Sequence, residues 1–297
     1  MARACDAVPA PAANQLKIGV CQCLIVNLTL CRQLECSAGT SRYLPPRRSS
    51  LAWKLLSSET VKDRPRIPSG RRIYAVGDIH GRADLLTRLF TRIDEDRKAR
   101  PIAETAEVFL GDYIDRGPDS HEVIELLIAR RRECKVMLLK GNHEDCAVQF
   151  LTDPTVLSGW KDIGGLHTIL SYGVLPKHAD HPQSQYQIAA AFRNAIPDSH
   201  HLFLRSLALS FTCGDFFFAH AGVRPGVPLH EQSQQDLLWI RDDFLLHEDD
   251  FGKVVVHGHT PARQPDVRPN RINIDTGAYA TGRLTCLVLE NDEMSFL

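Results

Sequence analysis

Short apolar runs alternate with segments of helical periodicity from about residue 71 onward. The runs Arg72–Val76, Glu107–Leu110 and Lys135–Lys140 are each followed by a glycine, and we predict that they are strands. Between them, apolar residues recur three and four positions apart, as they do in an amphipathic helix. Asp119 followed by Glu122 resembles a capping box at the start of the second helix. The order strand, helix, strand, helix, strand predicts a sheet with helices packed on it.

The C-terminal third contains similar apolar runs with less helical pattern between them. The strands expected there are Leu207–Cys213, Asp215–Ala219, Lys253–Val256, Ile272–Ile274 and Leu284–Leu289. Together with the first three strands, they predict an α/β fold with two mixed β-sheets and helices on the outside. Residues 145–206 separate the two groups of strands, and we expect them to form a helical insertion.

Residues 1–66 differ in composition from the rest, so we expect the folded domain to span residues 67–297. The segment Pro45-Pro-Arg-Arg-Ser-Ser50 is typical of a loop or linker. The mixed apolar stretch Ile18–Cys31 raises a signal peptide as an alternative, but polar residues dilute it and no clear cleavage site follows. The preferred interpretation is a poorly ordered extension on a cytoplasmic protein, with secretion or a periplasmic location as the alternative.

Composition limits the function without naming it. The chain has 297 residues, of which 43% are hydrophobic and 24% are charged, and its formal net charge is −1. A charge so close to zero argues against nucleic acid or an acidic membrane as a partner. No apolar run approaches the roughly 18 residues of a spanning helix, so we expect no stable membrane association. The nine cysteines lack the regular spacing of a disulfide framework.

Five short motifs carry the candidate chemistry, and each one lies at the end of a predicted strand. They are Gly77-Asp-Ile-His-Gly81, Gly111-Asp-Tyr-Ile-Asp-Arg-Gly117, Gly141-Asn-His-Glu144, His220-Ala-Gly222 and Gly258-His-Thr260. Any one Gly-Asp pair is usually a turn, and a lone histidine after a strand is usually a hydrogen-bonded edge residue. Because the strand ends of a sheet lie close together, five such motifs indicate one shared site.

Oxygen and imidazole side chains in these motifs form a plausible set of metal ligands. Asp78 and His80 are two positions apart, so both point to the same side of an extended segment. The side chains expected to converge are Asp78, His80, Asp112, Asn142, His220 and His259. A site without thiolates fits Mn²⁺, Fe or Zn²⁺. Two such ions, about 3.5–4 Å apart, can activate water and neutralise phosphoryl charge, which suits the hydrolysis of phosphate esters.

The first three motifs resemble the signature triplet of the phosphoprotein phosphatase family of calcineurin-like metallophosphoesterases, in its bacterial serine/threonine phosphatase form. His220-Ala-Gly222, Gly258-His-Thr260 and Ile274-Asp-Thr-Gly277 extend the resemblance, which covers residues 72–290. It implies a sandwich of two mixed β-sheets flanked by helices. It also implies a cofactor of two divalent metal ions, with Mn²⁺ as the first expectation and Fe or Zn²⁺ as alternatives.

The resemblance implies a place for each candidate ligand. The ligands of the first ion would be Asp78, His80 and Asp112. Those of the second ion would be Asp112 as the bridging residue, Asn142, His220 and His259. His257 is a rival to His259, but in similar bacterial enzymes the ligand is the histidine of the Gly-His-Thr motif.

Four further residues would carry the reaction that the resemblance implies, which is direct attack by a metal-bound hydroxide without a phosphoenzyme. His143 would protonate the leaving alkoxide, and Asp115 would orient it and stabilise the imidazolium. Arg116 would clamp phosphoryl oxygens in a forked contact. Arg241 resembles a second arginine that binds the phosphate in similar enzymes. The alternative interpretation is that Arg241 is an ordinary surface arginine without a role in the reaction.

Two substrate classes fit the same metal core. Phosphoserine or phosphothreonine in proteins is preferred, because no aromatic pair for gripping two adenines is evident in the sequence. The alternative is a dinucleoside polyphosphate, as in the symmetrical bis(5′-nucleosyl)-tetraphosphatases. Residues 145–206 would select between them. A binding module without catalysis would show lost metal ligands, whereas all six candidates are present.

Overall fold

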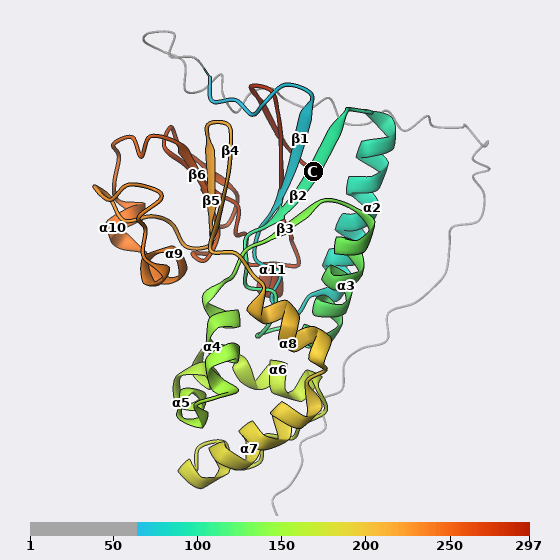
Figure 1. Cartoon of the computed structure of the whole chain (residues 1–297), viewed down its shortest axis with the longest axis vertical. Coiled ribbons are helices and arrows are strands. Elements are labelled where there is room, and N and C mark those ends of the chain that lie inside the picture. Colours follow the sequence, from blue (N-terminus) through green and yellow to red (C-terminus); the bar gives the residue numbers. More distant parts are fainter. Residues whose placement is uncertain (1–63) are drawn as a thin grey trace, which may run out of the picture. The chain divides into compact units, whose positions relative to one another are not determined.

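The computed structural model describes residues 64–297, so the expected extension over residues 1–66 lies almost wholly outside the described residues. The described part is built around two five-stranded β-sheets. Helices cover the outer faces of both sheets, and a further group of helices gathers at one end (Figure 1). The α/β architecture with two mixed sheets confirms the prediction from the sequence.

The first sheet has the strand order β10-β9-β1-β2-β3. Its strands are β1 (Arg71–Val76), β2 (Glu104–Phe109), β3 (Val136–Leu138), β9 (Cys286–Glu290) and β10 (Glu293–Phe296). The central strands β1, β2 and β3 are parallel, and β9 and β10 add to the edge in antiparallel fashion. The short, partly polar β10 was not among the predicted strands.

The second sheet has the strand order β4-β5-β6-β8-β7. Its strands are β4 (Ser210–Cys213), β5 (Phe216–Ala219), β6 (Val254–His257), β7 (Asp266–Val267) and β8 (Arg271–Asn273). The strand expected over Leu207–Cys213 begins only at Ser210, because Ala208 pairs with Leu139 at the end of the first sheet. This bridge ties the two sheets together where the chain passes from one to the other.

Side chains along each strand alternate between an inner and an outer apolar layer. On β1, Ile73 lies in the cluster between the two sheets, and its neighbour Tyr74 lies in the cluster under the outer helices. On β5, Phe218 faces inward and Phe217 packs against the helices on the other side. Strands buried on both faces read as continuous apolar runs, which is why the sequence pattern reveals them.

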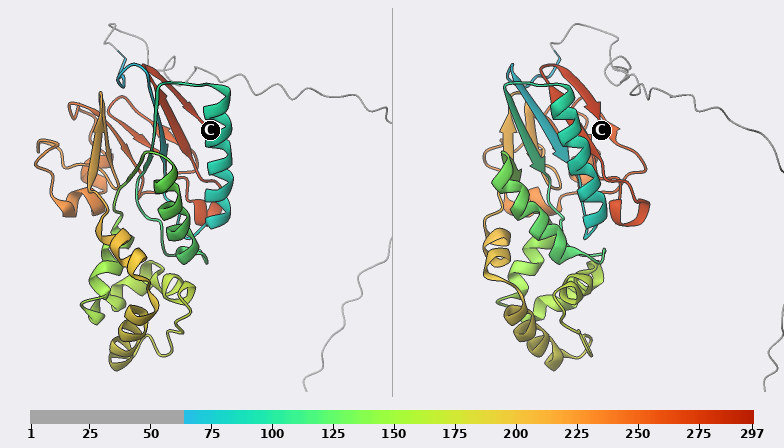
Figure 2. Two further views of the ribbon diagram at one scale, coloured as in Figure 1. Left: turned by 45° about the vertical axis from the view of Figure 1, so that its right-hand side comes forward. Right: turned by 90° about the vertical axis from the view of Figure 1, so that its right-hand side faces the viewer.

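The outer helices form two covering layers on opposite sides of the sandwich, as Figure 2 shows. The first sheet is covered by α2 (Ala83–Ala99) and α3 (Ser120–Glu133), and the second by α9 (Gln234–Trp239) and α10 (Asp242–Leu245). Asp119 is the N-cap residue of α3, but its side chain makes no capping hydrogen bond, so the predicted capping box with Glu122 is wrong. Within residues 64–297, none of the helices combines the length and apolarity that a bilayer crossing requires.

The remaining helices, which we call the helical block, connect β3 to β4. They are α4 (Asn142–Phe150), α5 (Leu157–Trp160), α6 (Gly165–Ser171), α7 (Pro182–Ala195) and α8 (Asp198–Arg205). Trp160 is buried at the centre of the block, with Phe150 and Phe192 rings 5.3 Å and 6.0 Å from its own. A short helix, α11 (Ala278–Thr281), precedes β9.

A buried ion pair links the first sheet to its helices. Glu107 on β2 is fully buried and accepts hydrogen bonds from the guanidinium of Arg130 on α3, the shortest at 2.6 Å. Arg97 on α2 approaches the same carboxylate to 2.9 Å. The pair therefore joins β2 to both outer helices.

We predict that Glu107→Ala lowers the free energy of unfolding by about 3 kcal/mol, because it leaves the buried charge of Arg130 without this partner. Urea denaturation would measure the loss. Glu104→Ala on the same strand is the matched control, since that carboxylate binds Arg71 and Lys135 at the surface. Equal losses for the two variants would show that burial of the pair is unimportant.

Candidate metal centre

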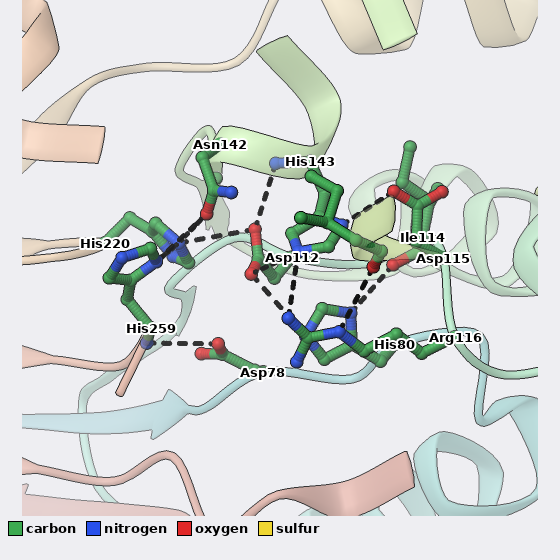
Figure 3. A network of polar contacts seen from close by, with 12 residues as sticks. Asp78, His80, Asp112, Ile114, Asp115, Arg116, Asn142, His143, His220 and His259 are labelled. Atoms are coloured by element: carbon green, nitrogen blue, oxygen red, sulfur yellow. Dashed lines mark hydrogen bonds and ion pairs between the residues drawn. The ribbon is translucent and has the colours of Figure 1, made fainter. Parts of the chain in front are cut away.

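The strand ends bring the six candidate ligands together (Figure 3). The loop after β1 carries Asp78 and His80, the loop after β2 carries Asp112, and α4 begins with Asn142. His220 follows β5, and His259 follows β6. All six side chains are buried. The parallel order of β1, β2 and β3 places the first three motifs at one edge, next to the helical block.

One half of the centre is a tight group of lone pairs. His220 Nε2 lies 3.0 Å from Asn142 Oδ1, 3.3 Å from Asp112 Oδ1 and 3.2 Å from His259 Nδ1. His220 Nδ1 donates to the carbonyl of Leu110 at 3.0 Å, so the neutral ring has no proton on Nε2. His220 Nε2 thus directs its lone pair at the side-chain oxygens of Asn142 and Asp112, and this arrangement fits a cation.

The other half lies around Asp112 and His80. His80 Nε2 is 3.5 Å from Asp112 Oδ2, and its Nδ1 donates to the carbonyl of Ile114 at 2.9 Å. Backbone acceptors of this kind orient metal-binding histidines and fix their tautomer. Asp78 Oδ2 accepts from the amide of His259 at 3.0 Å, whereas its buried Oδ1 has no hydrogen-bond partner among the described residues. A positive ion would satisfy that oxygen.

Burial moves the ionisation of the ligands in opposite directions. It raises the pKa values of Asp78 and Asp112 well above the usual range of aspartate. It lowers the pKa of His80 well below its usual value and that of His220 to about 3. The imidazoles are therefore neutral and available as ligands, while the carboxylates need a neighbouring cation to ionise.

Glycines in the motifs leave room for these carboxylates. A Cβ atom on Gly258 would lie 2.0 Å from Asp78 Oδ1, and a Cβ atom on Gly141 would lie 2.1 Å from Asp112 Oδ1. Both distances are far shorter than any contact between non-bonded atoms. A side chain at Gly258 or at Gly141 would thus collide with a candidate ligand, so packing requires glycine at these two positions.

The backbone at the centre is strained. Several candidate residues have positive φ angles between 48° and 70°, namely His80, Asp112, Asp115, Arg116 and His259. Such conformations are costly for residues with side chains, and they cluster at functional sites where the surrounding structure enforces them.

His257 lies apart from this group. Its ring meets Phe244 of α10 edge-on, with the ring centroids 4.8 Å apart. By contrast, a ring nitrogen of His259 lies within 4.8 Å of a carboxylate oxygen of Asp112 and a ring nitrogen of His220. The geometry therefore favours His259 over His257 as a ligand.

His143 and Asp115 form a buried pair beside the centre. His143 Nδ1 donates to Asp115 Oδ2 at 2.6 Å, and its Nε2 faces Asp112 Oδ2 at 3.6 Å. Two residues of the helical block hold Asp115: the indole of Trp160 donates to Oδ2 at 2.6 Å, and the hydroxyl of Thr168 donates to Oδ1. Sequence reasoning missed both residues, because neither belongs to a motif.

The two candidate arginines occupy different surroundings. Arg116 is half-buried, with Nη2 3.4 Å from His143 Nε2 and its guanidinium 4.9 Å from the ring of Tyr279. Arg241 is exposed and donates to the hydroxyl of Thr260 at 3.4 Å. It lines a cavity of about 330 Å³ together with Trp239. Arg116 therefore lies inside the cluster, and Arg241 lies at its margin.

Glu144 is a further residue whose importance the sequence did not reveal. Its fully buried carboxylate accepts hydrogen bonds from the amides of Gly141, Asp112 and Tyr113 at 2.8–2.9 Å. It also accepts a longer bond, 3.3 Å, from the amide of Ile114. One carboxylate thus joins the start of α4 to the loop after β2.

The model of the calcineurin-like phosphoesterase family matches residues 71–284. The chain belongs to this family. It is therefore a metallophosphoesterase, and its clustered carboxylate, amide and imidazole side chains fit the family's dinuclear, metal-dependent site.

Its relatives divide into two groups. An asymmetrical bis(5′-nucleosyl)-tetraphosphatase, PrpE, from Anoxybacillus flavithermus is 27% identical over 232 residues, which cover 71% of this chain and 88% of the relative. The serine/threonine-protein phosphatase BSL2 of Arabidopsis thaliana is 42% identical, but over 81 residues that cover 27% of this chain and 8% of the relative.

A solved structure has the same fold. It is the crystal structure of a candidate diadenosine tetraphosphatase, with a TM-score of 0.53 and 20% sequence identity. The likeness covers 78% of this chain and 97% of that one. At this identity it supports the fold and says nothing about substrate.

We predict that Glu144→Gln lowers the free energy of unfolding by about 2 kcal/mol, because an amide nitrogen would face the backbone N–H donors that the carboxylate now satisfies. Thermal and urea denaturation of the metal-free protein would measure the effect. The same exchange at the exposed Glu122 of α3 is the control and should leave stability unchanged. Wild-type stability in the Glu144 variant would contradict the role given to this carboxylate.

Proposed function

We propose that this metallophosphoesterase is a phosphomonoesterase that removes phosphate from phosphoserine and phosphothreonine in proteins, with Mn²⁺ as the preferred ion and Fe or Zn²⁺ as alternatives. The observation that carries the proposal is the Asp115–His143 pair beside the candidate metal centre, with 2.6 Å between the two polar atoms. An alkoxide is a poor leaving group, so its departure from a phosphate ester requires a proton donor of this kind.

The ligands divide as the family resemblance implies. Asp78, His80 and Asp112 would hold one ion, and Asp112, Asn142, His220 and His259 would hold the other. When bound, the two cations would supply Lewis-acid activation of water and neutralise charge on the phosphoryl oxygens. Glu144 would keep the loop of Asp112 and the start of α4 in register for both ions.

His143 would act as the general acid through Nε2. Asp115 accepts the hydrogen bond from Nδ1–H, so the other nitrogen would carry the mobile proton toward the leaving oxygen. Burial and the charge of Arg116 lower the pKa of His143 to about 3, so its protonated form depends on the opposing charges of Asp115 and a bound phosphate dianion. The Arg116 guanidinium, 3.4 Å from Nε2, disfavours a metal ion at this nitrogen and favours an anion there.

The arginines would then bind the phosphoryl group from two sides. Arg116 reaches the centre from the loop after β2, where the Tyr279 ring supports its guanidinium. Arg241 lines the cavity with Trp239, and its charge, after burial and His220, helps to lower the pKa of His259. Their forked donors suit the equatorial oxygens of a phosphate.

We predict that His143→Asn retains its metal ions but lowers turnover on a phosphoserine peptide by about 100-fold. Turnover on an aryl phosphate should fall much less, because a phenolate needs little help from an acid. Metal content measured by mass spectrometry and kcat measured on both substrates would test this. Equal losses on the two substrates would remove His143 from the role of proton donor and point to a structural or ligand role.

Hydrolysis of dinucleoside polyphosphates is the second candidate, and two observations favour it. The relative from Anoxybacillus flavithermus named as a tetraphosphatase aligns over most of both chains. In addition, two aromatic rings that could stack on bases lie beside candidate ligands: Trp239 is 6.3 Å from His259 and Tyr279 is 5.5 Å from His80, between ring centroids. That relative is named asymmetrical, whereas the sequence suggested the symmetrical reaction.

A pair of assays with Mn²⁺ separates the two candidates. We predict faster phosphate release from a phosphothreonine peptide than nucleotide release from diadenosine tetraphosphate, and little effect of Trp239→Ala on the peptide reaction. If the dinucleotide is the better substrate, Trp239→Ala should lower its kcat/KM by about 10-fold, since base stacking on an aromatic ring contributes about 1–3 kcal/mol. That outcome would replace the protein phosphatase proposal.

A further inference from the structure

A second group of potential metal ligands lies between α3 and the helical block. It consists of His121 and Glu125, one helical turn apart on α3, and His200 on α8, and each offers an atom within 4.8 Å of the other two. None of these residues belongs to the candidate metal centre or to the motifs found in the sequence. We call this group the α3–α8 triad.

We propose that the α3–α8 triad binds a third divalent transition-metal ion, with Zn²⁺ as the best match. Two imidazoles and one carboxylate are a ligand set that zinc accepts, and a water molecule can complete its four-coordinate geometry. Without a thiolate, the set also tolerates Co²⁺ or Ni²⁺. This inference does not depend on which phosphate ester the enzyme hydrolyses.

The surroundings of His200 match those of a metal-binding histidine. Its ring is fully buried, its Nε2 faces Glu125 Oε1 at 2.7 Å, and its Nδ1 lies 2.7 Å from the hydroxyl of Tyr172. With an ion on Nε2, the other nitrogen would donate its proton to Tyr172, and partners of this kind commonly orient histidine ligands.

His121 is the residue that hydrogen bonding leaves unexplained. Its ring lies 4.8 Å from that of His200 and 5.0 Å from that of Tyr172, yet its nitrogens make no hydrogen bond within residues 64–297. A network of hydrogen bonds alone would satisfy His200 and Glu125 and leave the half-buried imidazole of His121 to solvent. An ion shared by all three side chains would give it a partner.

The ion would have both an entry route and a structural effect. The side chain of Glu125 is 48% exposed, so the triad is open to solvent on that side. The backbone of His121 also donates to the hydroxyl of Ser171 at the end of α6, and Tyr172 follows directly. A bound ion would therefore fasten α6 and α8 of the helical block to α3.

The test counts zinc equivalents on the full chain after chelation, reloading and gel filtration. We expect one equivalent more in the unchanged protein than in His121→Ala or in Glu125→Gln, in which an amide oxygen can still accept the bond from His200. The extra equivalent should also raise the melting temperature of the unchanged protein, and this rise should be lost in both variants.

His201→Ala, on the same helix beside His200, is the matched control and should keep the extra equivalent. Far-UV circular dichroism of the metal-free variants would show that they are folded, and Glu125→Gln provides the test if His121→Ala is not. Equal zinc content in the unchanged protein and in a folded Glu125→Gln variant would overturn the proposal and leave the triad as a hydrogen-bonded contact.

Discussion

The hydrogen bonds to the buried carboxylate of Glu144 are the interaction on which the site depends. They join the amides of Gly141, Asp112 and Tyr113, which come from two loops at adjacent strand ends. Because a carboxylate has only acceptor oxygens, several N–H groups can converge on it without competition. This convergence sets the separation between Asp112 and the start of α4, and hence the positions of Asn142 and His143.

Around this anchor, the protein accumulates groups that would be unfavourable without a ligand. Buried aspartates lie beside one another, imidazole lone pairs face an amide oxygen at about 3 Å, and several backbone angles are strained. The buried Asp275 adds to the charge near Asp78 and raises the pKa of that carboxyl group further. Divalent cations would replace the repulsion between these groups by attraction to the metal, so the arrangement of the folded chain suits metal ions.

The helical block also takes part in the candidate chemistry. Trp160 and Thr168 donate to the carboxylate that binds His143, so the helical block is attached to the proposed general acid. Burial raises the pKa of Asp115 to about 7, and these two hydrogen bonds oppose the shift by favouring the charged form. A change in the helical block would therefore alter the surroundings of the proposed proton donor, His143.

The sequence by itself determined the α/β class and the candidate ligands, because each motif is local and directly follows a strand that its apolar run reveals. The pairing of His143 with Asp115 came from the family resemblance. The resemblance favoured His259 over His257, and the tertiary structure added the physical reason, since His257 ends β6 and faces Phe244 whereas His259 faces the other candidate ligands. Only the tertiary structure brought Trp160 and Thr168 to Asp115 across 45 and 53 positions of the chain. The tertiary structure also placed the backbone amides around Glu144 and brought the rings of His121 and His200 side by side. Such contacts depend on how helices and loops pack, and no short sequence pattern records that packing.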